Sequence, residues 1–290
     1  MHSEHLMPIR DVARLTGVNP VTLRAWERRH GLLVPHRTPK GHRLYGPDQV
    51  QRVQDILHWL ARGASVGQVR ELLDRQPSVA PQGDWQVRCQ QLADAITHLS
   101  SRSLDHHFNQ VMALYPSVTL CEHLLLPLMA QLAERWRSGF NARLEQAFFH
   151  TWLRSKLGAR VYHDNQLLDG PPALIVQEDE STFSADVWLC AWLFSSTGQP
   201  VVVLEQPIGL GQLRNAIVQL NPSTVVLCVG AQLERAVLLK ALQETTQPVL
   251  LGGLAASIHE AELRALALAN LHLFDSPPHA LREFQRLRAQ

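Results

Sequence analysis

The sequence predicts a multidomain α and α/β protein, with an N-terminal winged helix-turn-helix, a middle four-helix bundle and a C-terminal doubly wound five-stranded parallel sheet. Three observations predict this class. A strong helix-start signal follows a tight turn near the N-terminus. Apolar residues recur at helical spacing in the middle. Short continuous apolar runs then alternate with amphipathic stretches in the last part. With 290 residues, the chain is long enough for about two domains.

Two segments rich in proline and glycine divide the chain. They cover residues 77–84 and 165–172, and neither can continue a helix. We therefore expect domains over residues 1–76, 85–164 and 173–290.

The first domain begins with two short helices. Gly17 ends the first helix, because glycine accepts a positive φ. Asn19 is a favoured N-cap and Pro20 occupies the favoured first helical position, so a second helix begins here and extends to about His30. Two short helices joined by a tight turn predict a helix-turn-helix.

Charge is distributed unevenly along the chain. Residues 1–75 hold 12 Lys and Arg against 7 Asp and Glu, whereas residues 76–290 hold 15 against 19. Between residues 10 and 45 the count is 8 basic to 2 acidic residues. Such a basic segment is typical of a surface that binds a polyanion such as DNA.

The segment after the second helix predicts a wing. The turn Pro39-Lys40-Gly41 lies between two short extended stretches, which suits contact with the DNA backbone or the minor groove. Two more helices should follow, one capped by Asp48 and one over residues 65–73. The candidate DNA-contacting residues lie on the second helix and the wing: Thr22, Arg24, Trp26, Arg28, Arg29, Arg37, Lys40, Arg43 and Tyr45.

The middle of the chain is apolar at helical spacing. Leu120, Leu124, Leu128 and Leu132 each lie four residues apart, which predicts one helix of a bundle of about four helices. Pro127 lies inside this stretch and predicts a kink or break.

The last third alternates strands with helices. Its apolar runs are continuous, which indicates burial on both faces and a parallel, doubly wound sheet with any ligand at the carboxyl ends of the strands. The predicted strands cover residues 173–176, 201–204, 224–228, 249–251 and 271–274. The four cysteines, more than thirty residues apart, are expected to be buried apolar groups: Cys89, Cys121, Cys190 and Cys228.

Residues 8–75 resemble the winged helix-turn-helix of the MerR family of bacterial transcription regulators. The motif from Thr22 to Leu33, the wing from Gly41 to Tyr45 and the two following helices agree with that family in order and spacing. Residues 25–31, Ala-Trp-Glu-Arg-Arg-His-Gly, are one residue longer than the Tyr-Tyr-Glu pattern of the metal-sensing members. This length points to the branch with the CarH/LitR photoreceptors and the MlrA-type regulators.

The resemblance implies sequence-specific binding to double-stranded promoter DNA as a homodimer, together with RNA polymerase at the promoter. MerR proteins usually dimerise through a long helix after this domain, and here Pro77 and Pro81 interrupt it. We therefore expect dimerisation through the later domains, or only on DNA or on ligand binding.

The C-terminal half resembles the cobalamin-binding module of the same group, with departures at the expected ligands. The loop after the first strand has Thr182 where the cobalt-coordinating histidine is expected, and Ala185 where a glycine is expected. A hydroxyl is a poor cobalt ligand compared with imidazole. A serine after the third strand is also lost, in the segment Cys228 to Ala231.

The bundle departs from that pattern too. Photoreceptor members carry Trp, nine residues and then Glu-His, whereas Trp136 is here followed by Gln146 and Ala147, unless a shift of one residue brings Glu145 into place. Gly252 and Gly253 either allow close approach of a ligand or turn the chain. The candidate ligand-binding residues are Trp136, Glu145, Thr182, Gly252 and Gly253, with His150 and His163 as substitute cobalt ligands.

Two hypotheses follow for the C-terminal half. In the first, the cobalamin fold has no cofactor and serves dimerisation or partner binding. In the second, it binds a small molecule, which is either cobalamin without the histidine or another ligand such as a nucleotide. Thr182 favours the first, so we expect no cofactor and no metal site.

Other classes are not supported. No Gly-x-Ser-x-Gly, His-x-x-x-His or P-loop motif is present, so we expect no enzyme. No apolar run approaches the ~20 residues that span a bilayer, and the N-terminus is not a signal peptide. The expected location is therefore the cytoplasm, at the nucleoid.

Overall fold

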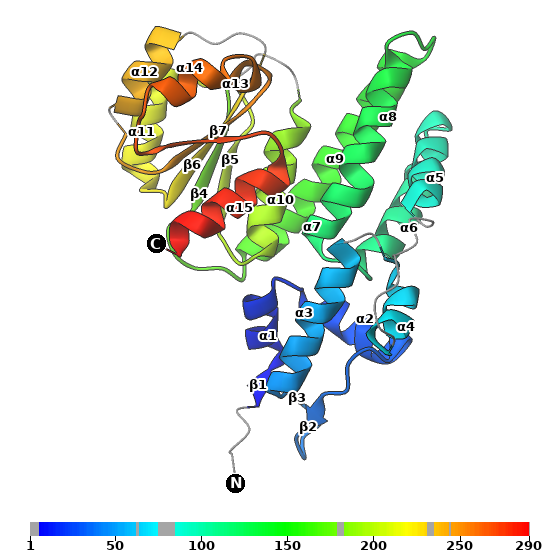
Figure 1. Ribbon diagram of the computed structural model, residues 1–290. Coiled ribbons are helices and arrows are strands. Elements are labelled where there is room, and N and C mark those ends of the chain that lie inside the picture. Colours follow the sequence, from blue (N-terminus) through cyan, green and yellow to red (C-terminus); the bar gives the residue numbers. More distant parts are fainter. Residues whose placement is uncertain are drawn as a thin grey trace. The chain divides into compact units, whose positions relative to one another are not determined.

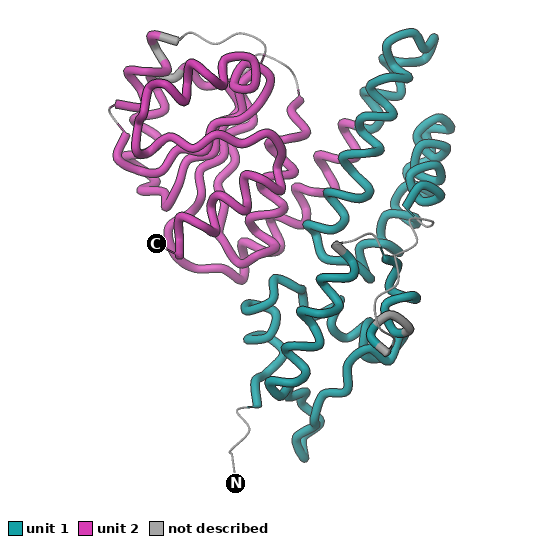
Figure 2. The backbone as a smooth tube through the Cα atoms, in the orientation of Figure 1, with its two compact units in different colours: residues 1–149 teal, residues 150–290 magenta. Residues whose placement is uncertain are grey.

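The protein forms two compact units, residues 1–149 and 150–290, which Figure 2 shows in different colours. The computed structural model describes residues 6–61, 64–74, 85–178, 183–230, 235–243 and 245–289. The first predicted linker, residues 77–84, lies outside these residues, so the division into three domains stays a prediction.

The first unit begins with the predicted helix-turn-helix. Helix α1 (Ile9–Thr16) ends at Gly17, whose φ is +70°, and α2 (Pro20–His30) follows. The Asn19 side chain accepts a hydrogen bond of 2.9 Å from the backbone N–H of Thr22. The local signals therefore set both ends of the turn where they were predicted.

The wing is a three-stranded antiparallel sheet rather than a two-stranded one. Strands β2 (His36–Arg37) and β3 (Arg43–Tyr45) are the predicted pair, and β1 (Met7–Pro8) adds to the free edge of β3. A two-residue strand leaves no periodic pattern, so only the tertiary pairing reveals it. Helices α3 (Pro47–Ala61) and α4 (Val66–Asp74) complete this part of the unit.

A helical bundle follows. Its helices are α5 (Trp85–Thr97), α6 (Ser101–Met112), α7 (Ser117–Leu120), α8 (Leu126–Trp136) and α9 (Ala142–Asn165). A π-helical turn, Cys121–Leu125, joins α7 to α8 directly before Pro127. Proline lacks the N–H of the α-helical pattern, and here the N–H of Leu126 bonds to Cys121 instead. The predicted irregularity at Pro127 is therefore a local change of helix type.

The second unit contains the predicted parallel sheet. Its strands are β4 (Ala173–Gln177), β5 (Val201–Leu204), β6 (Thr224–Val229), β7 (Val249–Gly253) and β8 (Leu271–Phe274). Their order is β5-β4-β6-β7-β8, and every neighbouring pair is parallel. All five strands lie where the apolar runs predicted them.

Helices cover both faces of this sheet (Figure 1). Helices α10 (Ala185–Ser196) and α15 (Pro277–Arg288) pack together on one face. The other face carries α11 (Leu210–Leu220), α12 (Arg235–Gln243), α13 (Leu254–Ile258) and α14 (Glu260–Ala265). Alternate strand residues such as Leu174, Val225 and Leu251 form the core beneath this second group. This is the predicted doubly wound architecture, and it positions the carboxyl ends of the strands as a ligand edge.

The four cysteines are buried and free, as predicted. Among the described residues, no helix has the length and apolar character that a membrane crossing requires.

Candidate nucleic-acid interface and ligand site

The exposed face of α2 carries the basic residues. Arg24 and Arg28 are four residues apart, so they lie on the same side of the helix, and both are exposed. Arg29 is exposed next to them, and Lys40 is exposed in the turn of the wing. The second helix of the helix-turn-helix and the turn of the wing therefore both present positive charge to solvent.

Glu27 connects this helix to the wing. Its carboxylate accepts hydrogen bonds from Arg43 and from Nη2 of Arg37, the latter at 2.7 Å, and only 14% of its side chain is exposed. Burial alone would raise the pKa of Glu27, but the hydrogen bonds from Arg43 and Arg37 lower it. The carboxylate therefore stays charged and fixes the wing against α2.

The two wing arginines differ in what remains available for DNA. About half of the Arg37 side chain is exposed (51%), whereas Arg43 is 19% exposed and directed at Glu27. Arg37 can contact a phosphate while it keeps its bond to Glu27. Arg43 holds the wing against α2 through its hydrogen bond to Glu27. Its contact with DNA stays a prediction.

The structure corrects the expected exposure of three candidate residues. Thr22, Trp26 and Tyr45 are all completely buried. Their side chains are absent from the surface that carries Arg24, so they support the helix and the wing from inside. Sequence pattern did not separate the two sides of α2, because the helix is short and its apolar residues are few.

Trp26 connects α2 to the turn between α6 and α7 of the bundle. Its indole N–H donates a hydrogen bond of 2.7 Å to the carbonyl of Leu114, in the turn between α6 and α7. In the same turn, the hydroxyl of Tyr115 accepts a bond of 3.2 Å from the backbone N–H of Val66, at the start of α4. Two hydrogen bonds to residues 114–115, one partly buried and one buried, thus hold α2 and α4 against the bundle.

The structure brings two predicted ligand residues together in the bundle. The Glu145 carboxylate accepts hydrogen bonds from the Trp136 indole at 3.0 Å and from Arg135 at 2.6 Å. Glu145 is 8% exposed, so this buried carboxylate already has partners from α8. Its present contacts join two helices.

The two predicted glycines lie at the end of β7 and contact their own unit. A Cβ on Gly252 would lie 2.2 Å from the Phe274 ring, and one on Gly253 would lie 2.1 Å from the Val229 carbonyl oxygen. Both glycines therefore allow close packing between β7 and its neighbours. Thr182 lies outside the described residues.

The two histidines weighed as substitute ligands differ in their surroundings. His150 stacks on Phe183 with ring centroids 4.5 Å apart, and burial lowers its pKa, which favours the neutral imidazole. His163 is exposed. Within the described ranges, no group of three His, Cys, Asp or Glu side chains is arranged to hold a metal ion.

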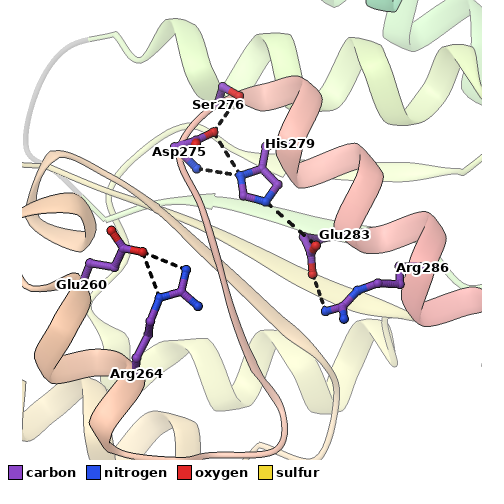
Figure 3. A network of polar contacts seen from close by, with 7 residues as sticks. All are labelled: Glu260, Arg264, Asp275, Ser276, His279, Glu283 and Arg286. Atoms are coloured by element: carbon purple, nitrogen blue, oxygen red, sulfur yellow. Dashed lines mark hydrogen bonds and ion pairs between the residues drawn. The ribbon is translucent and has the colours of Figure 1, made fainter.

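A cavity of about 440 Å³ lies beside the edge strand β8, lined by residues of α14 and α15. Figure 3 shows the polar groups around it. Arg264 pairs with Glu260 at 2.7 Å and Arg286 with Glu283 at 2.5 Å, while His279 bonds to Asp275 at 3.0 Å. The guanidinium groups of Arg264 and Arg286 that line the cavity are thus paired with carboxylates.

Comparisons with known protein families match two segments of the chain. Residues 7–76 match the family described as MerR HTH family regulatory protein, and residues 88–160 match the family described as B12 binding domain. The chain carries a MerR-type helix-turn-helix domain followed by a B12-binding-type domain.

Known relatives of this chain include transcription regulators. The HTH-type transcriptional regulator MlrA of Escherichia coli is 38% identical over 127 residues, which are 44% of this chain and 52% of MlrA. The chain thus spans about half the length of this relative. The HTH-type transcriptional repressor CarH of Myxococcus xanthus is 26% identical over 291 residues, covering 94% of this chain and 96% of CarH.

Solved structures are similar at a lower level. A cobalamin-binding protein from Desulfitobacterium hafniense is 16% identical with a TM-score of 0.35, covering 70% of this chain and 98% of that protein. A MerR-family transcriptional regulator from Bacillus cereus is 20% identical with a TM-score of 0.25, covering 52% of this chain and 98% of that regulator.

Several candidate ligand residues that the structure describes already contact the chain's own atoms. The Phe274 ring fills the space at Gly252, and Glu145 is held by Arg135 and Trp136. On the side where a Cβ would stand, both glycines thus face the chain's own atoms.

Sequence reasoning missed two residues of the MerR-type domain. Glu27 lies next to arginines in the sequence and was not predicted. Its role depends on hydrogen bonds from the wing residues Arg37 and Arg43, which only the folded structure brings close to it. Val21 was passed over in favour of Thr22, yet 56% of Val21 is exposed while Thr22 is buried. The N-cap at Asn19 could have indicated this, since it fixes which residues of the first turn face inwards.

Proposed function

We propose that this protein is a sequence-specific DNA-binding transcription regulator of the MerR type. The observation that carries the proposal is the exposed Arg24–Arg28 face of α2, fixed against the wing by Glu27. The first turns of such a helix contact base edges in the major groove, and arginines pair with guanines or phosphates. Arg24, Arg28, Arg29, Arg37, Lys40 and Arg43 are the proposed DNA-contacting residues.

The proposal includes a homodimer on a two-fold related site, since two copies of one helix match two half-sites. RNA polymerase at the promoter and a location at the nucleoid in the cytoplasm belong to the same proposal. The names of the relatives describe regulators, which supports a function other than catalysis. Deformation of the DNA allows either activation or repression.

Arg24→Ala tests this function. Duplexes are first selected from a random library by the wild-type protein, and affinity is then measured by gel shift over a salt titration. Loss of Arg24 is expected to weaken binding to the selected duplex by about 1–3 kcal/mol, because a guanidinium contact with a base is removed. Arg102→Ala, at an exposed arginine of α6, serves as the matched control and should bind as the wild type does.

Two results would contradict this proposal. One is wild-type protein that shows no preference for any selected sequence over random DNA. The other is Arg24→Ala protein with unchanged affinity and specificity, which would mean that α2 does not face the DNA bases.

For the helical bundle and the C-terminal sheet together we propose a module for dimerisation or partner binding that works without histidine-ligated cobalamin. Support comes from the packing of Gly252 and Gly253 against Phe274 and Val229, and from the satisfied carboxylate of Glu145. The alternative is a sensor that binds cobalamin through other groups, or binds a different small molecule. The match of residues 88–160 to the B12 binding domain family is the observation that supports that alternative.

An absorption titration separates the two. The purified protein, handled in the dark, is mixed with adenosylcobalamin or methylcobalamin and passed through gel filtration. We expect the colour to separate from the protein. Stoichiometric colour retained with the protein would contradict the cofactor-free module and make this a cobalamin-dependent regulator.

A further inference from the structure

The first turn of α2 presents an apolar side chain to solvent. Val21 follows the N-cap Asn19 and Pro20, and 56% of it is exposed. Its neighbour Thr22 is completely buried, so the cap geometry turns Thr22 inwards and Val21 outwards. The isopropyl group is therefore held in place by the backbone of the first turn.

Val21 belongs to the same exposed strip as the two arginines. Positions three and seven residues further along a helix lie on one side, and Arg24 and Arg28 occupy them. The strip thus begins with an apolar group and continues with two cations. The arginines can donate hydrogen bonds to base edges or phosphates, whereas Val21 has no hydrogen-bonding group at all.

The major groove of B-DNA offers one apolar group, the C5-methyl of thymine. Because the first turns of a recognition helix lie nearest to the base edges, a valine at this position meets bases rather than phosphates. We propose that Val21 contacts a thymine methyl group and makes the protein prefer thymine at one position of each half-site. This inference rests on the proposed DNA-binding function and adds a specificity-determining residue to it.

The test removes one methyl group at a time. In the duplex selected by the wild-type protein, each thymine is replaced by uracil, which lacks only the C5-methyl. At one position of each half-site, the wild type should lose about fourfold in affinity, as expected for one buried methyl group. Val21→Ala should show a clearly smaller difference between thymine and uracil at that position, because its two γ-methyl groups are gone and only the Cβ methyl is left.

The matched control is Val87→Ala in α5, where a valine is exposed to a similar extent (53%). This variant should keep the full difference between thymine and uracil. Both substitutions replace an exposed helical valine by the better helix former alanine, so loss of folding does not explain a difference between them.

The outcomes separate this inference from the function on which it rests. If the wild-type protein selects no sequence, the proposed function fails. If it selects a sequence but tolerates uracil everywhere, or if Val21→Ala keeps the same preference for thymine, then the role of Val21 is overturned while DNA binding stands.

Discussion

Replacing Trp26 with alanine is expected to lower the free energy of unfolding of the first unit by about 3–5 kcal/mol. Trp26 is completely buried, and its indole N–H bonds to Leu114 at 2.7 Å, so the substitution removes a large core side chain and an internal hydrogen bond. Urea unfolding followed by circular dichroism measures the change.

Trp26→Phe distinguishes burial from DNA contact. Phenylalanine fills most of the space but cannot donate to Leu114, whose carbonyl then lacks this partner, so a loss of about 1–3 kcal/mol in stability is expected. The folded protein should bind DNA as the wild type does. Arg24→Ala should show the reverse pattern, with weaker DNA binding and unchanged stability. Wild-type stability combined with weakened DNA binding in Trp26→Phe would show that the indole contacts DNA after all.

Gly253→Ala is expected to destabilise the second unit by roughly 2–6 kcal/mol. The backbone of Gly253, with φ 110° and ψ −177°, lies in a region that essentially only glycine adopts, and forcing alanine there costs about 1–3 kcal/mol. Overlap of the new Cβ with the Val229 carbonyl adds about 1–3 kcal/mol. Thermal unfolding measures the effect. In the same experiment, Gly211→Ala should be neutral or slightly stabilising, since its Cβ would enter open space within α11.

The neighbouring glycine allows a rescue. Gly252→Ala alone places a Cβ 2.2 Å from the Phe274 ring, and Phe274→Leu in the same chain should recover part of the lost stability by making room. Stability close to wild type in Gly252→Ala and Gly253→Ala, without any second change, would show that the space is open and would favour a bound ligand there.

Much of the fold follows from local sequence. Asn19, Pro20 and Gly17 set the ends of α1 and α2 through capping and backbone conformation, which depend on only a few neighbouring residues. The five strands followed from continuous apolar runs, because a parallel sheet buries both faces.

The site depended on contacts that sequence does not encode locally. Trp26 was expected on the DNA side, yet its partner Leu114 is 88 residues away. From the sequence, Gly252 could either allow close approach of a ligand or turn the chain. Its close packing against Phe274 is visible only in the folded structure. Glu27 lies among arginines in the sequence, and its role follows only from the positions of Arg37 and Arg43 in the folded wing.

The hydrogen bonds from Trp26 and Val66 to residues 114–115 also affect the design of chimaeras that join this domain to a different C-terminal domain. The MerR-type domain does not satisfy all of its hydrogen bonds by itself, because two of them are made to the turn between α6 and α7, which follows residues 77–84 in the sequence. A chimaera that joins residues 1–76 to a foreign sensor leaves the Trp26 indole without its acceptor. A chimaera that is to keep the stability of this domain therefore needs the turn between α6 and α7 as well as residues 1–76.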